Sequence, residues 1–250
     1  MRDTLYLQFR ETAPDGRLAY AVTGAQPGLG VSAEHATLDT ILTLAPGKRL
    51  VLFVPGADVR LTSVQVPARQ MQKVLQAAPY ALEDQLAEDV DTLHFAIGPR
   101  QADGSHPVAV TARTRMESWL APLRARNLRP DAVVPETLCL PVPAAGRWSA
   151  LAEAEPAGGR ITVRTGPFSG FACSVDELNT YLQLADPENL IPLRLFVPRP
   201  VEHDFTRLSR PVELLPGHGS GLEVLVRHFR PESSINLMQG PYSQQESWQR

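Results

Sequence analysis

The sequence has few of the residues that define several protein classes. It contains only 2 cysteines, Cys139 and Cys173, with no C-x-x-C pair and no histidine at ligand spacing, which argues against a disulfide framework or a zinc cluster. Its formal net charge is only −3. A charge this small does not gather phosphates over a surface, so nucleic-acid binding is disfavoured.

No apolar run approaches the roughly 18 residues that a membrane-spanning helix needs. The first residues, Met1 to Thr4, lead directly into an alternating pattern, without the apolar stretch of a secretory signal. We therefore expect a soluble chain that is not exported. In a reducing compartment both cysteines should be buried free thiols, with no disulfide between them.

What the sequence does contain is typical of a folded protein. Its 250 residues suffice for about one and a half to two domains, and hydrophobic residues make up 43% of them. The 23 prolines are nearly twice the usual share of about 5%, which predicts stiff connections and short elements.

The first part of the chain predicts the order β-β-β-α-β. Two runs with period two, residues 5–9 and 18–22, form a hairpin. A third short strand is expected near Val31, then a helix over 38–42. The unbroken apolar run 50–54 predicts a strand that is covered on both faces.

Residues 59–128 have a different hydrophobic pattern, which predicts a compact β-α-β-β-α unit inserted in this first half. Its first helix keeps one apolar stripe in phase across Pro79, which predicts a kinked helix or two helices in line. Two strands and a second helix follow. Thr114 and Glu117 form a capping box that predicts where the second helix begins.

The remaining chain predicts a second half with the same order. The stretch 141–146, rich in Pro, Ala and Gly, looks like a boundary. After it, three strands, a helix opened by the capping box of Ser174 and Glu177, and one more strand repeat β-β-β-α-β. A further box, Ser220 with Glu223, opens a last helix.

Two such halves match the order of the actin-like ATPase (RNase H-like) fold, an α/β class with mixed sheets. We predict a first RNase H-like subdomain from residues 1–58 and 129–145, and an inserted subdomain over 59–128. A second RNase H-like subdomain covers 146–239, and residues 240–250 form a polar linker. Because this linker has no apolar stripe to bury, we expect residues 241–250 to be poorly ordered.

Actin-like enzymes hold phosphates with D-x-G-type turns between the first two strands of each half, where aspartate organises the metal and backbone N–H groups bind the oxygens. Neither turn fits here. Turn geometry alone explains Asp15-Gly16 in the first, and the second, residues 153–159, contains no aspartate. A P-loop motif is also missing from the sequence. Nucleotide hydrolysis is therefore disfavoured.

Two other motifs have simpler explanations. Residues 28–33 have the letters G-x-G-x-x-A, but the next strand ends in Val54-Pro55-Gly56, without the acidic residue of a dinucleotide site. His218 precedes Ser220 where a nucleophile elbow needs glycine, so the serine is better explained as a helix cap. We predict no catalytic, cofactor or metal site.

Residues 83–91, here called the acidic segment, contain more acidic residues than a short helix needs. They are Glu83, Asp84, Glu88, Asp89 and Asp91. Glu83 and Asp84 are expected near the start of the helical turn after Pro79, and the other three near its negative end, which prefers cations. Two interpretations stay open: a solvated face that aids solubility, and a surface for a basic partner.

Three segments carry a resemblance in their residues, order and spacing. They are Val54-Pro55-Gly56, the run from Pro79 to Asp89 that leads to Leu93-His94-Phe95, and the run from Ile235 to Tyr242. Together they resemble the cytoplasmic domain of the L protein of bacterial type II secretion systems (the GspL family), over essentially the whole chain. Ala78 stands where that family often has leucine, a change that affects packing only.

The resemblance implies an actin-like cytoplasmic domain without nucleotide hydrolysis, at the cytoplasmic face of the inner membrane. In that family it is joined to a membrane helix and a periplasmic domain, which we expect to be absent here. The implied role is an adaptor, not an enzyme. Its implied partners are the N-terminal domain of the secretion ATPase (the E protein), the M protein of the inner-membrane platform and a second copy of itself.

Two questions stay open from the sequence. The rival function is a catalytically active actin-like ATPase with an atypical phosphate loop. A related pilus assembly protein, PilM, shares a similar segment but belongs with an intact nucleotide site, which this sequence does not show. The partner surface is placed at the acidic segment. The alternative surface is a sheet edge of either half, where an added strand would satisfy open N–H and C=O groups.

Overall fold

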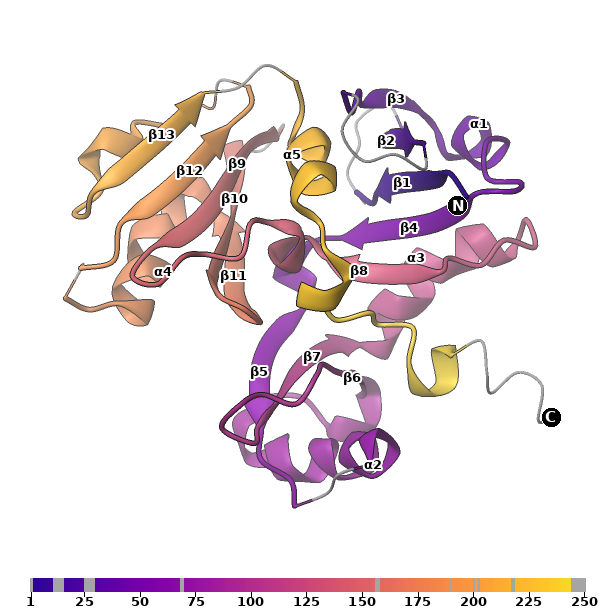
Figure 1. The fold of residues 1–250 in the computed structure, drawn as a ribbon, viewed down its shortest axis with the longest axis horizontal. Helices are drawn as coiled ribbons and strands as arrows, with labels where there is room; N and C mark the ends of the chain where they lie inside the picture. The colour runs from indigo at the N-terminus through magenta and orange to yellow at the C-terminus, as the bar shows by residue number, and fades with distance from the viewer. Residues whose placement is uncertain are drawn as a thin grey trace.

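The computed structural model describes residues 2–10, 16–24, 30–67, 70–155, 158–188, 190–199, 201, 203–216 and 219–243. The strands in these ranges form two five-stranded sheets and one three-stranded sheet. Figure 1 shows them as three lobes, with the two larger sheets side by side above the smaller one.

The first sheet is built from β1 (Thr4–Gln8), β2 (Arg17–Thr23), β3 (Glu34–Thr37), β4 (Arg49–Val54) and β8 (Ala132–Pro135), with helix α1 (Leu38–Leu42) after β3. Its order is β3-β2-β1-β4-β8. The strands β1, β4 and β8 pair in parallel, whereas β2 is antiparallel to its neighbours. The third strand, β3, begins at Glu34, after the predicted position at Val31. The sequence did not reveal its position, because it is an edge strand with mostly exposed side chains and no apolar alternation.

The second sheet is built from β9 (Trp148–Glu155), β10 (Gly158–Gly166), β11 (Ser169–Ser174), β12 (Leu193–Val197) and β13 (Val212–Pro216), with helix α4 (Leu178–Ala185) after β11. Its order, β11-β10-β9-β12-β13, repeats that of the first sheet. The strand β13 was not expected. It is short, follows Pro211, ends at Pro216, and is stabilised by parallel pairing with β12.

The three-stranded sheet has the order β5-β7-β6, and all its pairs are antiparallel. Its elements are β5 (Arg60–Val64), α2 (Met71–Leu82), β6 (Leu93–Ile97), β7 (His106–Ala112) and α3 (Arg113–Arg124). The helix α2 is one helix with Pro79 inside it. It ends at Leu82, and a 3-10 turn, Glu83–Gln85, follows.

The hydrophobic cores do not each contain only the helices that neighbour their sheet in the sequence. The buried side chains of α2 pack against the three-stranded sheet, but Met116, Trp119, Leu120 and Leu123 of α3 belong to the core of the first sheet. Helix α5 (Gly221–His228) also packs into that first core, and Figure 1 shows it between the two larger sheets. The division of the chain into the predicted subdomains stays a prediction.

The C-terminal part of the described chain is packed against the three-stranded sheet. Gly240–Tyr242 form a 3-10 turn, and the Tyr242 ring contacts the His94 ring at a centroid distance of 4.8 Å. The expectation of poor order is therefore wrong for residues 241–243, because Tyr242 has an aromatic partner that the polar sequence does not reveal. Residues 244–250 lie outside the described ranges.

The buried His94 predicts a pH-dependent stability. Burial lowers the pKa of His94 to about 4, although the bond from Nε2 to the Leu237 carbonyl oxygen, at 2.7 Å, opposes the shift. The unfolded chain then binds more protons between pH 4 and about 6.5, so this stability is complete above about pH 6.5 and is lost as the pH falls. Between pH 7.5 and 5.0 we expect His94 to account for a loss of about 2 kcal/mol.

Urea denaturation at both pH values checks this. The variant His94→Gln keeps an N–H donor but does not titrate, so its stability should fall less than that of the wild type over this range. The variant His35→Gln, at an exposed position, is the matched control and should follow the wild type. Equal pH dependence in His94→Gln and the wild type would contradict the prediction.

Candidate functional site

The turns that would hold phosphates in an actin-like enzyme are bridged by charged side chains. The first turn begins at Arg10, after β1, and the second connects Glu155 of β9 with Gly158 of β10. Residues 11–15, which include Asp15, and residues 156–157 lie outside the described ranges. The described side chains at the two turns meet in one cluster of ion pairs.

We call this cluster the inter-half network; its members are Arg10, Glu136, Glu153, Glu155 and Arg160. Arg10 pairs with Glu136, with Glu153 at 3.0 Å and with Glu155 at 3.9 Å. Arg160 pairs with the same carboxylates at 3.3, 2.9 and 3.3 Å. Each guanidinium therefore bridges all three carboxylates.

The side chains of the inter-half network are largely buried. The side chain of Glu136 is 1% exposed, that of Arg160 10% and that of Arg10 18%. Gln8, also buried, donates from Nε2 to Glu136 Oε1 at 2.9 Å and to Glu153 Oε1 at 3.2 Å. Charges this close and this buried interact strongly because solvent screens them little.

The charges of the network determine what it can bind. Burial opposes ionisation of Glu153, but the neighbouring Arg10 and Arg160 outweigh it and lower the pKa of the carboxyl. Burial likewise disfavours the charge of Arg160, but Glu136, Glu153 and Glu155 outweigh it and raise its pKa. With two guanidiniums and three carboxylates, the formal charge is 2 − 3 = −1. A phosphate placed here would meet carboxylates, and both cations already have anionic partners.

The N-terminus of α5 lies against the same network. A Cβ added at Gly221, the first residue of α5, would lie 2.0 Å from Glu153 Oε1. A helix N-terminus favours a negative charge, and here the carboxylate of Glu153 takes that place. No room is left at this point for an external anion.

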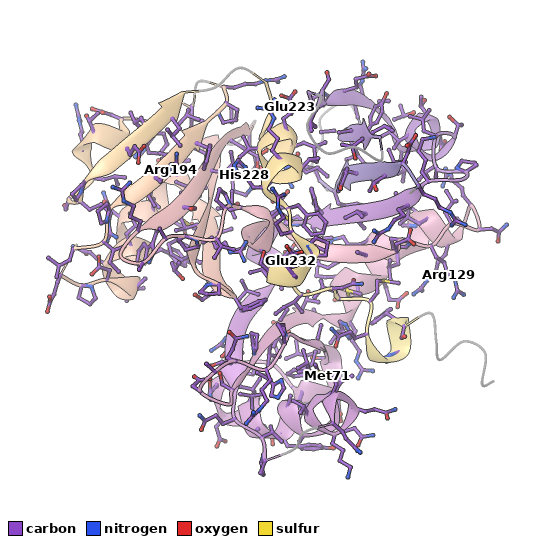
Figure 2. The ribbon with its side chains drawn as sticks, in the orientation of Figure 1. Met71, Arg129, Arg194, Glu223, His228 and Glu232 are labelled. Atoms are coloured by element: carbon purple, nitrogen blue, oxygen red, sulfur yellow. The ribbon has the colours of Figure 1, made fainter. Side chains whose placement is uncertain are left out.

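The other motifs have structural roles in the described residues. Ser220 caps α5 by accepting a bond from the Glu223 backbone N–H, while His218 lies outside the described ranges. Glu223 Oε1 accepts a hydrogen bond from the Ala33 backbone N–H at 3.1 Å. The last residue of the G-x-G-x-x-A motif therefore contacts α5. Figure 2 shows Glu223 at the end of α5 that faces the first sheet's β3.

The acidic segment is exposed, but its shape differs from the expected one. Glu83 and Asp84 do open a helical turn after Pro79, but it is the short 3-10 turn that follows the end of α2, and Glu88, Asp89 and Asp91 lie beyond it. The reason is that the chain turns towards β6 here. Arg60 holds the turn by donating to the Gln85 carbonyl oxygen at 2.7 Å.

Most of the five carboxylates have no structural task that the described residues reveal. All five residues are exposed, and none forms an ion pair with another residue in the described ranges. Asp89 is the exception in bonding, because its Oδ1 accepts from the Asp91 backbone N–H at 2.9 Å and caps a 3-10 turn, Val90–Thr92. Next to them, Tyr80 on α2 is 75% exposed.

The described residues offer little other chemistry. Within them, no group of three or more His, Cys, Asp or Glu side chains is placed to hold a metal ion. Both cysteines are free and buried, and burial raises the pKa of the Cys173 thiol to about 12. None of the described helices has the length and apolar character to cross a membrane.

The family model of type II secretion system (T2SS), protein L, matches residues 24–245. The chain belongs to this protein L family. It is 28% identical over 233 residues to type II secretion system protein L of Dickeya chrysanthemi, covering 93% of this chain and 54% of that protein. With the protein of Vibrio cholerae it shares 25% over 224 residues, covering 88% and 53%. The chain thus spans about half the length of these curated protein L relatives.

Solved structures agree with the fold. The cytoplasmic domain of EpsL, an inner-membrane component of the type II secretion system of Vibrio cholerae, has a TM-score of 0.74 and 21% identity, covering 96% of this chain and all of that one. A chain of the PilM–PilN type IV pilus biogenesis complex has a TM-score of 0.55 and 11% identity, covering 90% and 97%. The predicted fold class, α/β with mixed sheets, is confirmed for this chain.

The inter-half network itself was missed by the sequence analysis. Its residues belong to five separate positions between Arg10 and Arg160, and no local motif connects them. The one local signal is that Glu153, Glu155 and Arg160 lie at or beside the predicted hairpin turn of residues 153–159. The pairs of Arg160 with Glu153 and Glu155 lie within the second sheet, but those of Arg10 with Glu153 and Glu155 exist only because the two sheets meet.

Proposed function

We propose that this protein L chain is a non-enzymatic adaptor of the type II secretion machinery, which binds the N-terminal domain of the secretion ATPase. The observation that carries this proposal is the inter-half network, whose net negative charge takes the place of a nucleotide's phosphates. Function follows from the site and not from the fold, and a cluster that disfavours phosphates favours partner binding over nucleotide hydrolysis. The proposed location is the cytoplasmic face of the inner membrane, with the M protein and a second copy as further partners.

The rival function is an actin-like ATPase with an atypical phosphate loop. Titration calorimetry with ATP and magnesium separates the two functions, and we expect no saturable heat at micromolar ATP. Phosphates would have to displace Glu153 from Arg10 and Arg160, and would leave a buried carboxylate without its cations. Saturable micromolar binding would support the ATPase and overturn the adaptor-only proposal.

For the contact with the ATPase domain we propose the acidic segment, Glu83, Asp84, Glu88, Asp89 and Asp91. Exposed carboxylates without ion-pair partners are available for a basic surface, and such charges mainly speed association. Tyr80 supports the choice, because an exposed tyrosine beside a charged rim is a common anchor in protein interfaces.

Charge reversal tests this surface. Changing Glu88, Asp89 and Asp91 together to lysine should weaken binding of the ATPase N-terminal domain at least about tenfold at low salt, and less at high salt. Biolayer interferometry at two salt concentrations would measure the affinity and the association rate. Circular dichroism would confirm that the variant is folded.

The matched control changes Asp176, Glu188 and Glu232 to lysine. These residues are also exposed acids, and the substitution alters the net charge by the same amount. The control should bind like the wild type. If the Glu88, Asp89 and Asp91 variant stays within about twofold of the wild type, the acidic segment is not the contact, and the open edges at β3 and β13 become the better candidates.

A further inference from the structure

The inter-half network connects parts of the chain that belong to different halves of the fold. Arg10 directly follows β1 of the first sheet, whereas Glu153 and Glu155 lie on β9 and Arg160 on β10 of the second. Glu136 lies in the segment by which the chain leaves β8 towards β9. Every ion pair of Arg10 with the second sheet therefore spans the boundary between the halves.

The halves approach each other closely beside the network. A Cβ added at Gly56, just after β4, would lie 2.4 Å from Thr137 Oγ1 and 3.2 Å from Ala172 Cβ of β11. Thr137 is the neighbour of Glu136 in the crossing segment. The crossing segment is the place where the chain passes from the first half to the second, and the network lies next to it.

Separation of the halves would break the network first. If Arg10 moved away from Glu153 and Glu155, Arg160 would be the only cation of the network left beside its three carboxylates. Two of these, Glu136 and Glu153, are largely buried. A partly buried charge that loses its partner is strongly unfavourable, so the open arrangement is populated much less than the closed one.

We propose that the inter-half network locks the two halves together, at the place where an actin-like ATPase would hold its nucleotide. The protein then keeps one arrangement of its halves without any ligand. A fixed arrangement presents a constant surface to partners, whereas a nucleotide-dependent one would change with each turnover. This inference concerns the halves themselves and holds whichever surface binds the ATPase domain.

Distance measurement between the halves tests the lock. Cysteines introduced at Thr43, after α1, and at Gln183, on α4, are exposed positions in the first and second half. Spin labels there would report the distance distribution by pulsed electron resonance. Cys139 and Cys173 are buried, so unsubstituted protein serves as the labelling control.

The informative variant is Arg10→Gln with Glu153→Gln, which removes one charge of each sign and leaves the net charge of the network unchanged. We expect the width of the distance distribution to about double in this variant. Arg10→Lys keeps the charge but loses the planar fork, so its distribution should lie between those of the double variant and the wild type. Arg194→Gln, which removes an exposed arginine from β12, should leave the distribution unchanged.

Circular dichroism establishes that each variant is folded. The lock is overturned if the folded double variant has the distribution of the wild type, or if Arg194→Gln broadens it equally. If the double variant does not fold, Arg10→Lys decides: a wild-type distribution in Arg10→Lys together with unchanged thermal stability would also refute the lock.

Discussion

Replacing Arg164 by methionine should lower the free energy of unfolding by about 3–5 kcal/mol. Arg164 lies on β10 and has no solvent exposure. It donates to five carbonyl oxygens, those of Leu138, Leu140, Gly166, Pro167 and Ser233, at 2.7, 2.6, 3.2, 2.5 and 2.5 Å. Methionine fills part of the space but leaves these buried oxygens without a donor.

The charge of Arg164 makes this site unusual. Within the described residues it pairs with no carboxylate, and burial lowers its pKa to about 10, so the side chain is still protonated at neutral pH. Its cost of burial is offset by carbonyl dipoles alone. Because Leu138 and Ser233 lie outside β10, Arg164 fastens the second sheet to the two segments that connect the halves.

Urea denaturation of Arg164→Met and wild type at pH 7 would measure the effect. Arg164→Lys should recover only part of the stability, because one ammonium cannot reach five carbonyls. Arg194→Met is the matched control at an exposed arginine of the same sheet, and should change stability by less than about 0.5 kcal/mol. A loss below about 1 kcal/mol in Arg164→Met would show that water replaces the guanidinium at the carbonyls.

Trp119→Ala should be comparably destabilising, by about 3–5 kcal/mol. Trp119 lies on α3, has no solvent exposure and belongs to the core of the first sheet. Truncation to alanine removes a large apolar surface and leaves a cavity between α3 and that sheet. In Trp119→Phe, by contrast, most of the volume is kept, and the removed Nε1–H has no hydrogen-bond partner among the described residues. That variant should cost less than about 1.5 kcal/mol.

Hydrogen exchange shows which core the tryptophan supports. In Trp119→Ala, protection should fall most in β4 and β8 of the first sheet, and less in β5, whose residue Val64 packs with α2. Equal loss in all three sheets, or loss confined to β5 and β6, would mean that α3 stabilises the inserted unit instead.

Much of the fold could be predicted because its signals are local. The alternation in β1 and β2, the apolar run of β4 and the stripe of α2 depend on which side chains face the core. The capping box of Ser174 and Glu177 is present with both of its bonds, and Ser220 caps α5 as expected. These bonds join residues three positions apart, so the sequence contains all of their parts.

The local predictions fail where tertiary pairing sets an element's limits. Thr114 does not cap α3, because β7 pairs with β6 up to Ala112 and the chain enters the helix directly at Arg113. The strand β13 has no sequence signal strong enough to outweigh Pro211 before it and Pro216 at its end, and it exists through pairing with β12. The helix α2 ends before the acidic segment because the chain must reach β6.

The order of most elements, the two similar halves and the lack of phosphate-binding aspartates could be predicted from the sequence, because each depends on neighbouring residues. Which charges meet could not, because it depends on the packing of the two sheets. Arg10, Glu136 and Glu153 are distant along the chain and acquire their pairing when the two sheets come together. Ion pairs and buried cores depend on distances in space, which no local pattern encodes. The same reason assigns α3 to the first core, although its sequence neighbours build the three-stranded sheet.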